Sequence, residues 1–149
     1  EVNTLTGEIK VLRFLGAHDS GRAMNEKTYA NQVIGGITMG IGFGLTENRV
    51  MDREHRGKVL NQNLHDYKLP TALDAPADKQ VLILDAHDTD VNTTGAKGIG
   101  EPATIPTAPA IANAVFHAIG VRMPDAPMHP SQVLNALAAQ AGAKGQKRG

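Results

Sequence analysis

Residues 28–47 read TYANQVIGGITMGIGFGLTE, and this stretch predicts a long helix from about Thr28 to Glu47. Three of its glycines recur every four residues and therefore line one face of the helix: Gly36, Gly40 and Gly44. Each glycine costs about 1 kcal/mol of helix stability relative to alanine, so the stripe indicates close approach of another backbone or a bound ligand. Membrane helix dimers carry a similar stripe, but the uncharged run Gln32–Thr46 is too short to span a bilayer.

Extended segments flank this helix. Residues 1–15 predict a hairpin with a turn at Thr6-Gly7 and a second strand near 8–15, in which three apolar residues alternate: Ile9, Val11 and Leu15. Because the chain begins inside this hairpin, we expect it to be a fragment or a cleaved product. A polar hairpin is expected over Met51–Asn63, with its turn near His55-Arg56-Gly57.

The second half predicts one buried-type strand, Val81–Leu84, and a helix over Thr107–Ile119. Pro106 and Pro109 lie at the entry of this helix and Gly120 lies just past its end, the asymmetry typical of helix termini. A short helix is expected over Ser131–Ala139. The fold class is therefore α+β, with mixed strands and helices over residues 1–139, incomplete on its own, and a flexible basic tail over residues 140–149.

Composition excludes several classes of function. The 15 basic and 15 acidic residues cancel and only 3% of residues are aromatic, which disfavours nucleic acid as a partner. The chain has no cysteine, so disulfides, cysteine-ligated zinc, thiol nucleophiles and iron–sulfur ligation within the chain are excluded. A cytoplasmic location is the expectation, with the periplasm as the alternative.

The segment Gly95–Glu101 carries the strongest chemical signal, since three glycines in it allow a bulky group to approach the backbone. The spacing fits neither nucleotide-binding fingerprint, and Glu101 would repel a phosphate. One interpretation is a plain tight turn with a solvated glutamate. The other is a general base held between Gly100 and Pro102, whose partial desolvation would raise the pKa of its carboxyl toward the working pH.

Two further groups of residues are ambiguous. Gln32, in the first turns of the glycine-striped helix, is either a solvated residue or one that recognises a polar ring system through its amide. The segments His18-Asp19 and His87-Asp88-Thr89-Asp90 contain metal-ligand residue types, but they lack the paired helical spacing of metallohydrolases. Neither of the two serines, Ser20 and Ser131, lies in a nucleophile elbow.

Taken in order, the motifs of this chain resemble the last part of the molybdenum-binding catalytic subunit of the xanthine dehydrogenase/aldehyde oxidase family. The resemblance covers residues 1–138, and it rests on His18-Asp-x-Gly…Asn25, Gln32-x-x-Gly-Gly, Gly40-Ile-Gly, Asp66-Tyr-Lys-Leu-Pro-Thr71, Gly98-Ile-Gly-Glu101-Pro, Ala110-Ile-Ala-Asn-Ala114 and Gly120-Val-Arg. Any one of these motifs is weak evidence, and their shared order makes them strong.

The resemblance implies the C-terminal part of a molybdopterin-binding domain. It implies that Glu101 is the catalytic base, which takes a proton from a metal-bound hydroxide that then attacks an aldehyde or N-heterocycle carbon. Gln32 would hydrogen-bond the pterin, and Gly98, Ile99 and Gly100 would border the same site. The implied cofactor is molybdenum-molybdopterin in its dinucleotide form, with 2Fe-2S and FAD on other domains or subunits.

The chain departs from the family pattern in two ways. Met39 stands where many relatives have a second glutamine, which puts one cofactor contact in doubt. The family's subunit is also several times longer, so the expected partners are the remainder of the molybdenum-binding subunit, iron–sulfur and flavin subunits, and a small-molecule substrate. The alternative function is a non-catalytic assembly module that retains the family fold.

Overall fold

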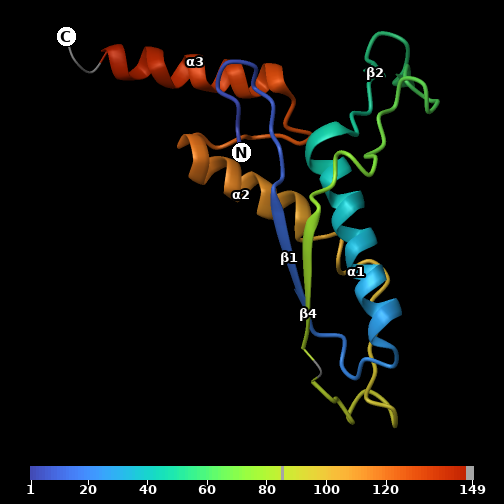
Figure 1. Ribbon diagram of the computed structural model, residues 1–149. Helices are drawn as coiled ribbons and strands as arrows, with labels where there is room; N and C mark the ends of the chain where they lie inside the picture. The colour runs from blue at the N-terminus through green and yellow to red at the C-terminus, as the bar shows by residue number, and fades with distance from the viewer. Residues whose placement is uncertain (85, 147–149) are drawn as a thin grey trace.

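The computed structural model describes residues 1–84 and 86–146 and has an α+β fold, as the sequence predicts. A two-stranded sheet and helix α1 form an elongated stem, and helices α2 and α3 lie across one end of it (Figure 1). The elements in chain order are β1 (Arg13–His18), α1 (Glu26–Ile41), the π-helical turn η1 (Gly42–Thr46), β2 (Met51–Asp52), β3 (Lys58–Val59), β4 (Asp78–Ile83), α2 (Thr107–Ile119) and α3 (Pro130–Gln146).

Strands β1 and β4 are parallel neighbours, with Arg13 opposite Asp78 and His18 opposite Ile83. Helix α1 lies directly on β1, because a Cβ at Gly16 would come within 2.7 Å of Val33 Cγ1. The strands occupy 13–18 and 78–83, not the predicted 8–15 and 81–84. Of the expected hairpin at the N-terminus, one antiparallel bridge forms, between Val2 and Ile9.

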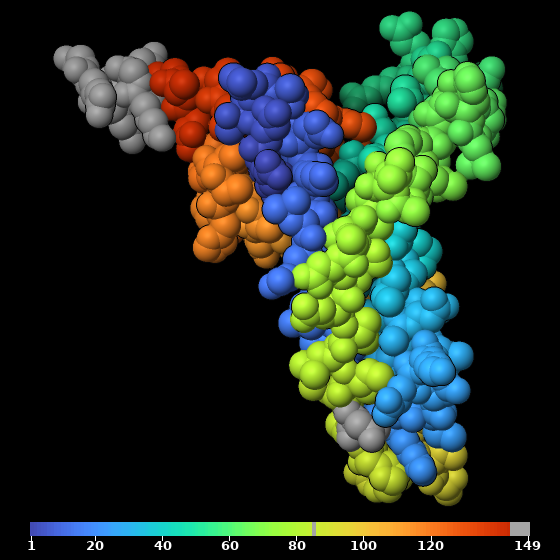
Figure 2. Space-filling model, in the orientation of Figure 1, coloured from blue at the N-terminus to red at the C-terminus, as the bar shows by residue number. Residues whose placement is uncertain are grey.

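The predicted burial of the sheet is wrong on one face. Leu15, one of the three alternating apolar residues, is 56% exposed because Gly16 is the residue that faces α1. Leu82, in the strand predicted to be buried, is 50% exposed. A strand covered by a helix on one side only buries alternate residues, and Figure 2 shows β4 bare on its other side.

The glycine stripe, which runs along α1 and into η1, packs against another segment of backbone, as predicted. Gly36, Gly40 and Gly44 are all buried. A Cβ at Gly36 would lie 2.9 Å from the Ala103 carbonyl carbon, and one at Gly40 would lie 3.0 Å from the Thr104 carbonyl oxygen. The small residues therefore allow the chain that enters α2 to lie along α1.

Helix α1 begins at Glu26, two residues before the predicted start, because the side chain of Asn25 caps it by accepting from the Thr28 N–H at 3.0 Å. The helical path continues to Thr46, but with π geometry from Gly42, where the Glu47 N–H donates to the Gly42 carbonyl at 2.8 Å. The bounds predicted for α2 are confirmed, and Gly120 ends it in the left-handed conformation with φ of 70°.

The core lies where α1 meets α2 and contains eight buried side chains, Tyr29, Val33, Ile37, Ile41, Ala103, Ile111, Val115 and Met128. The predicted hairpin turn is confirmed, since β2 pairs with β3 and both Arg56 and Gly57 have positive φ. Helix α3 extends to Gln146, beyond the predicted end at Ala139, so the helix includes most of the expected tail, and residues 147–149 lie outside the described residues. No helix within residues 1–84 and 86–146 is long and apolar enough to cross a bilayer.

Candidate functional site

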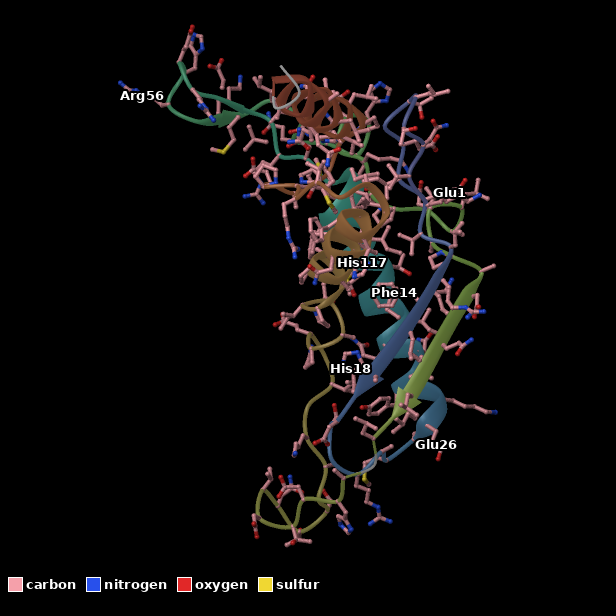
Figure 3. All side chains as sticks on the ribbon, turned by 90° about the vertical axis from the view of Figure 1, so that its left-hand side faces the viewer. Glu1, Phe14, His18, Glu26, Arg56 and His117 are labelled. Atoms are coloured by element: carbon pink, nitrogen blue, oxygen red, sulfur yellow. The ribbon has the colours of Figure 1, made fainter. Side chains whose placement is uncertain are left out.

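The candidate site is formed by two loops that meet where α1 begins, at the end of the stem opposite α2 and α3 (Figure 1). One loop, residues 19–25, follows β1, and the other is the segment Gly95–Glu101. The Arg22 N–H donates to the Gly95 carbonyl at 2.7 Å, and the Lys97 N–H donates to the Ser20 carbonyl at 2.7 Å. Figure 3 shows His18 and Glu26 at this end, and Arg56 far away at the tip of the β2–β3 hairpin.

Glycine is required where the loops cross. Gly21 has a φ of +63°, and a Cβ at this position would lie 2.2 Å from the Gly95 carbonyl oxygen. Gly95 has a φ of +70°, and a Cβ there would overlap the imidazole ring of His87. The backbone contact between the two loops therefore depends on both residues having no side chain.

An ion-pair cluster adds to the loop contact. Lys97 Nζ lies 3.2 Å from an oxygen of Asp88 and 3.5 Å from an oxygen of Asp19. Its hydrogen bond with Asp88 raises the pKa of Lys97 and lowers the pKa of Asp88. Asp88, one of the metal-ligand residue types noted in the sequence, thus forms an ion pair with Lys97. Within the part of the chain that the structure describes, no group of His, Cys, Asp or Glu residues could hold a metal ion.

Gln32 connects helix α1 to the glycine loop. Its Nε2 donates to the carbonyl oxygen of Gly100 at 2.6 Å, across 68 residues of sequence. Two of the predicted cofactor-binding residues are thus in direct contact. The side chain of Gln32 is partly buried and makes this hydrogen bond, and its recognition of a polar ring system stays a prediction.

A cavity of about 300 Å³ lies beside this contact. Gln32, Ile99 and Gly100 line it, whereas Gly98 and Glu101 lie outside its lining. The other lining residues come from the two loops and the first turn of α1, and they are Ser20, Arg22, Met24, Asn25, Thr28, Tyr29, Ala96 and Lys97. Sequence reasoning did not single out Arg22, Thr28 or Lys97, because each is an ordinary polar residue until the fold brings the loops together.

Glu101 differs from the expectation. Its side chain is exposed, so this chain does not provide the partial desolvation that the sequence suggested. Its carbonyl oxygen accepts from the Thr104 N–H at 2.9 Å, within a turn that leads to α2. A Cβ added at Gly98 or at Gly100 would meet no atom within 4 Å among the described residues. The space beside the loop is therefore open to a group that this chain does not contain.

The residues present fit a polar, anionic cofactor such as a phosphorylated pterin. Arg22, a positively charged residue, lines the cavity, and Gln32 keeps its amide oxygen available as an acceptor while its nitrogen is bonded to Gly100. The glycines at 98 and 100 leave room for a flat ring system to approach the loop.

Comparison with known proteins identifies the class. The profile of the molybdopterin cofactor-binding domain matches residues 1–76, which are half of the chain and include Gln32. The chain belongs to this family. The resemblance to the molybdenum-binding subunits of the xanthine dehydrogenase/aldehyde oxidase family is thereby confirmed.

Two similar proteins are named as molybdenum-binding subunits. The aldehyde oxidoreductase molybdenum-binding subunit PaoC of Escherichia coli is 38% identical over 136 residues, which are 91% of this chain and 18% of PaoC. The putative xanthine dehydrogenase molybdenum-binding subunit XdhA of E. coli is 38% identical over 130 residues, 85% of this chain and 16% of that protein. The chain therefore spans less than a fifth of the length of these relatives.

Solved structures agree with the fold. Quinoline 2-oxidoreductase from Pseudomonas putida 86 superposes with a TM-score of 0.82 at 28% identity, covering 92% of this chain and 17% of that one. The aldehyde oxidoreductase from Desulfovibrio gigas superposes with a TM-score of 0.80 at 29% identity, covering 92% of this chain and 14% of that one.

Proposed function

We propose that this chain is part of the catalytic subunit of a molybdenum hydroxylase that oxidises an aldehyde or an N-heterocycle at an electrophilic carbon, with oxygen derived from water. Glu101 is the general base. The observation that carries the proposal is the 2.6 Å hydrogen bond that joins Gln32 to the loop of Glu101 beside an open cavity. The names of the relatives support the reaction class.

The cofactor of the proposed enzyme is molybdenum-molybdopterin in its dinucleotide form, with 2Fe-2S and FAD on other domains or subunits. When bound, it supplies the Lewis acid and the electron acceptor of the oxidation. Gln32 and Arg22 hold its polar groups at the cavity. Gly98 and Gly100 keep the loop free of side chains, so the cofactor can approach its backbone.

The role of Glu101 is to accept a proton. Its carboxylate is exposed here, so it is free to contact groups supplied by the rest of the enzyme. Closure of the site by cofactor and neighbouring segments would exclude water around it. A positioned general base of this kind contributes about 10²–10⁴-fold to the rate.

Glu101→Gln in the complete enzyme tests this role, because glutamine keeps the size and the hydrogen-bonding reach but cannot act as the base. Turnover should fall about 10⁴-fold or more, while molybdenum and pterin contents stay near wild type. Glu8→Gln, at another exposed glutamate of this chain, is the matched control and should keep full activity. Near-normal turnover of Glu101→Gln at full molybdenum loading would refute the assignment, and a loss of activity explained by loss of molybdenum would make Glu101 a cofactor-retention residue.

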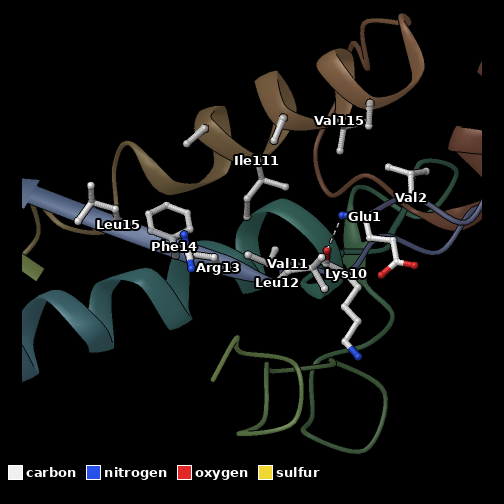
Figure 4. Close-up of a pocket in the computed structure, with 13 residues that line it drawn as sticks. Glu1, Val2, Lys10, Val11, Leu12, Arg13, Phe14, Leu15, Ile111 and Val115 are labelled. Atoms are coloured by element: carbon white, nitrogen blue, oxygen red, sulfur yellow. Dashed lines mark hydrogen bonds between the residues drawn. The ribbon is translucent and has the colours of Figure 1, made fainter. Parts of the chain in front are cut away.

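The proposed main partner is the remainder of the molybdenum-binding subunit. The β1–β4 sheet exposes Leu15 and Leu82, and Leu12 and Leu84, which flank the two strands, are exposed as well. A mainly apolar cleft of about 400 Å³ lies between residues 10–15 and the face of α2 that carries Ile111 and Val115 (Figure 4). We expect these surfaces to be buried in an interface of more than about 2,000 Å², as in obligate assemblies.

A non-catalytic assembly module is the second candidate, and the exposure of Glu101 is the observation that favours it. Molybdenum and pterin analysis of the complete purified protein separates the two. Stoichiometric cofactor supports the enzyme, and its absence supports the module.

A further inference from the structure

The loop that carries Glu101 is fixed at both of its ends. On one side, Lys97 is bonded through its backbone to Ser20 and through its side chain to Asp88. On the other side, the chain packs on the glycine stripe of α1, where a Cβ at Gly36 would come within 2.5 Å of Ala103 Cβ. Residues 98–102 form the span between these two anchors.

Two contacts hold the middle of the span within the described part of the chain. The side chain of Ile99 is half-buried at the edge of the core. The hydrogen bond from Gln32 Nε2 to the Gly100 carbonyl is the polar contact from another element. Both glycines of the span are exposed, and glycine is the residue with the most backbone freedom, so without this bond the chain on either side of Gly100 could rotate.

The Gly100 carbonyl and the Glu101 N–H belong to one peptide group, which is planar. A donor that fixes the carbonyl oxygen therefore also fixes the nitrogen of Glu101 and the direction of its Cα. We propose that Gln32 is a positioning residue for Glu101: its amide nitrogen holds the Gly100–Glu101 peptide, while its amide oxygen remains available to the cofactor. This inference rests on the proposed function, since it assigns Gln32 a role in the placement of the base.

The test is Gln32→Met in the complete enzyme, because methionine keeps the length and volume of the side chain, without charge, but cannot donate. Hydrogen exchange of the amides in residues 99–101 should become faster, while exchange in residues 103–108 and in α1 should stay as in wild type, which also reports that the fold is intact. At equal molybdenum content, kcat should fall about 10–100-fold, the scale on which a small misplacement acts, and KM should change little.

Two further variants separate the roles of the two amide atoms. Gln32→Lys keeps a donor near Gly100 but removes the acceptor, so it should restore slow exchange at residues 99–101 even if cofactor binding weakens. Asn31→Ala is the matched control, an exposed amide one position along α1 that is absent from the cavity lining, and it should leave exchange and kcat unchanged.

Unchanged exchange at residues 99–101 in Gln32→Met would overturn the inference, and so would faster exchange with an unchanged kcat. Loss of molybdenum with unchanged exchange would assign Gln32 to the cofactor alone. Failure of the proposed function is a separate result, because it is read from Glu101→Gln: an active Glu101→Gln enzyme refutes the base whatever the exchange of Gln32→Met shows.

Discussion

Asp74 organises the turn after the Asp66–Thr71 motif with a single carboxylate. It accepts from Lys68 Nζ at 2.6 Å, from the Thr71 N–H at 2.7 Å and from the Thr71 hydroxyl at 2.7 Å. These bonds, led by the one from Lys68, hold the pKa of Asp74 down at about 2, from an ordinary value of 3.8. The same turn contains Pro70, whose ring contacts η1 at Gly42.

The shift of the Asp74 pKa predicts a pH-dependent local stability. A lowered carboxyl pKa stabilises the fold above the unfolded value of 3.8, and the stabilisation is lost as the pH falls through about 2. Asp74→Asn should therefore lower the free energy of opening of this turn by about 1–2 kcal/mol at neutral pH. Amide hydrogen exchange of Thr71 at several pH values is the measurement. A difference between wild type and variant that did not shrink between pH 4 and pH 2 would contradict it.

Among single residues, the ones that the sequence predicts to form the site belong to short motifs. The motifs Gln-x-x-Gly-Gly and Gly-x-Gly-Glu are each weak evidence alone, and it is their shared order along the chain that predicts Gln32, Gly98, Ile99, Gly100 and Glu101 as site residues. Lys97 directly precedes the second motif and has no signal of its own in the sequence, because its partners Asp19 and Asp88 become neighbours only after the loops cross. The exposure of Glu101 could not be predicted either, since it depends on which segments cover the loop.

At the scale of the element, the glycines of α1 are not equivalent. A Cβ at Gly40 would lie 2.3 Å from Thr107 Cβ and 3.0 Å from the Thr104 carbonyl oxygen, so alanine cannot be accommodated without moving α1 away from the entry of α2. Gly35 lies on the exposed side of the same helix, and a Cβ there would meet nothing within 4 Å among the described residues.

Gly40→Ala should destabilise the protein by about 1–3 kcal/mol through overpacking, against a smaller gain in helix propensity. Gly35→Ala, the matched control, should stabilise it by about 0.5–1 kcal/mol, since only the propensity changes. The Tm of the complete subunit should therefore fall for Gly40→Ala and hold or rise for Gly35→Ala. Equal Tm shifts for the two variants would show that the stripe is not a packing face.

Helices were easier to predict than the sheet. The bounds of α2 follow from local signals, Pro106 before it and Gly120 after it. The sheet pairs β1 with a strand much later in the chain, so its register and its covered face depend on where α1 lies. The alternation of Ile9, Val11 and Leu15 does not show which residue contacts α1, because that contact falls on Gly16, which has no apolar side chain.

At the scale of the whole molecule, we expect further chain on the apolar sheet face that no other element covers within residues 1–84 and 86–146. Leu12, Leu15 and Leu82 are each at least half exposed. Leu15 lies in β1, Leu12 lies just before β1, and Leu82 lies in β4. Large side chains with this exposure are costly to leave in water over a contiguous surface. This agrees with a chain that spans 18% of the length of PaoC.

Hydroxyl-radical footprinting of the complete subunit tests this burial. The three leucines should be protected nearly as well as Ile37, which is fully buried within this chain and serves as the internal reference. The expected protection follows from packing of the rest of the subunit on the sheet. Leucines at these positions that react as readily as free leucine would show that the face stays open to solvent.

The four positions Gln32, Gly36, Gly40 and Gly44 follow one another along a single face of helical chain, and their contacts follow the segment 100–108 in the same order. Gln32 fits the residue opposite it through a hydrogen bond, and the three glycines fit the residues opposite them because they have no side chain. The sequences of the two segments therefore have to match each other. A chimera that takes residues 95–108 alone from a relative would place that loop against a helix whose glycines fit a different sequence. Residues 26–46 should therefore be exchanged together with residues 95–108.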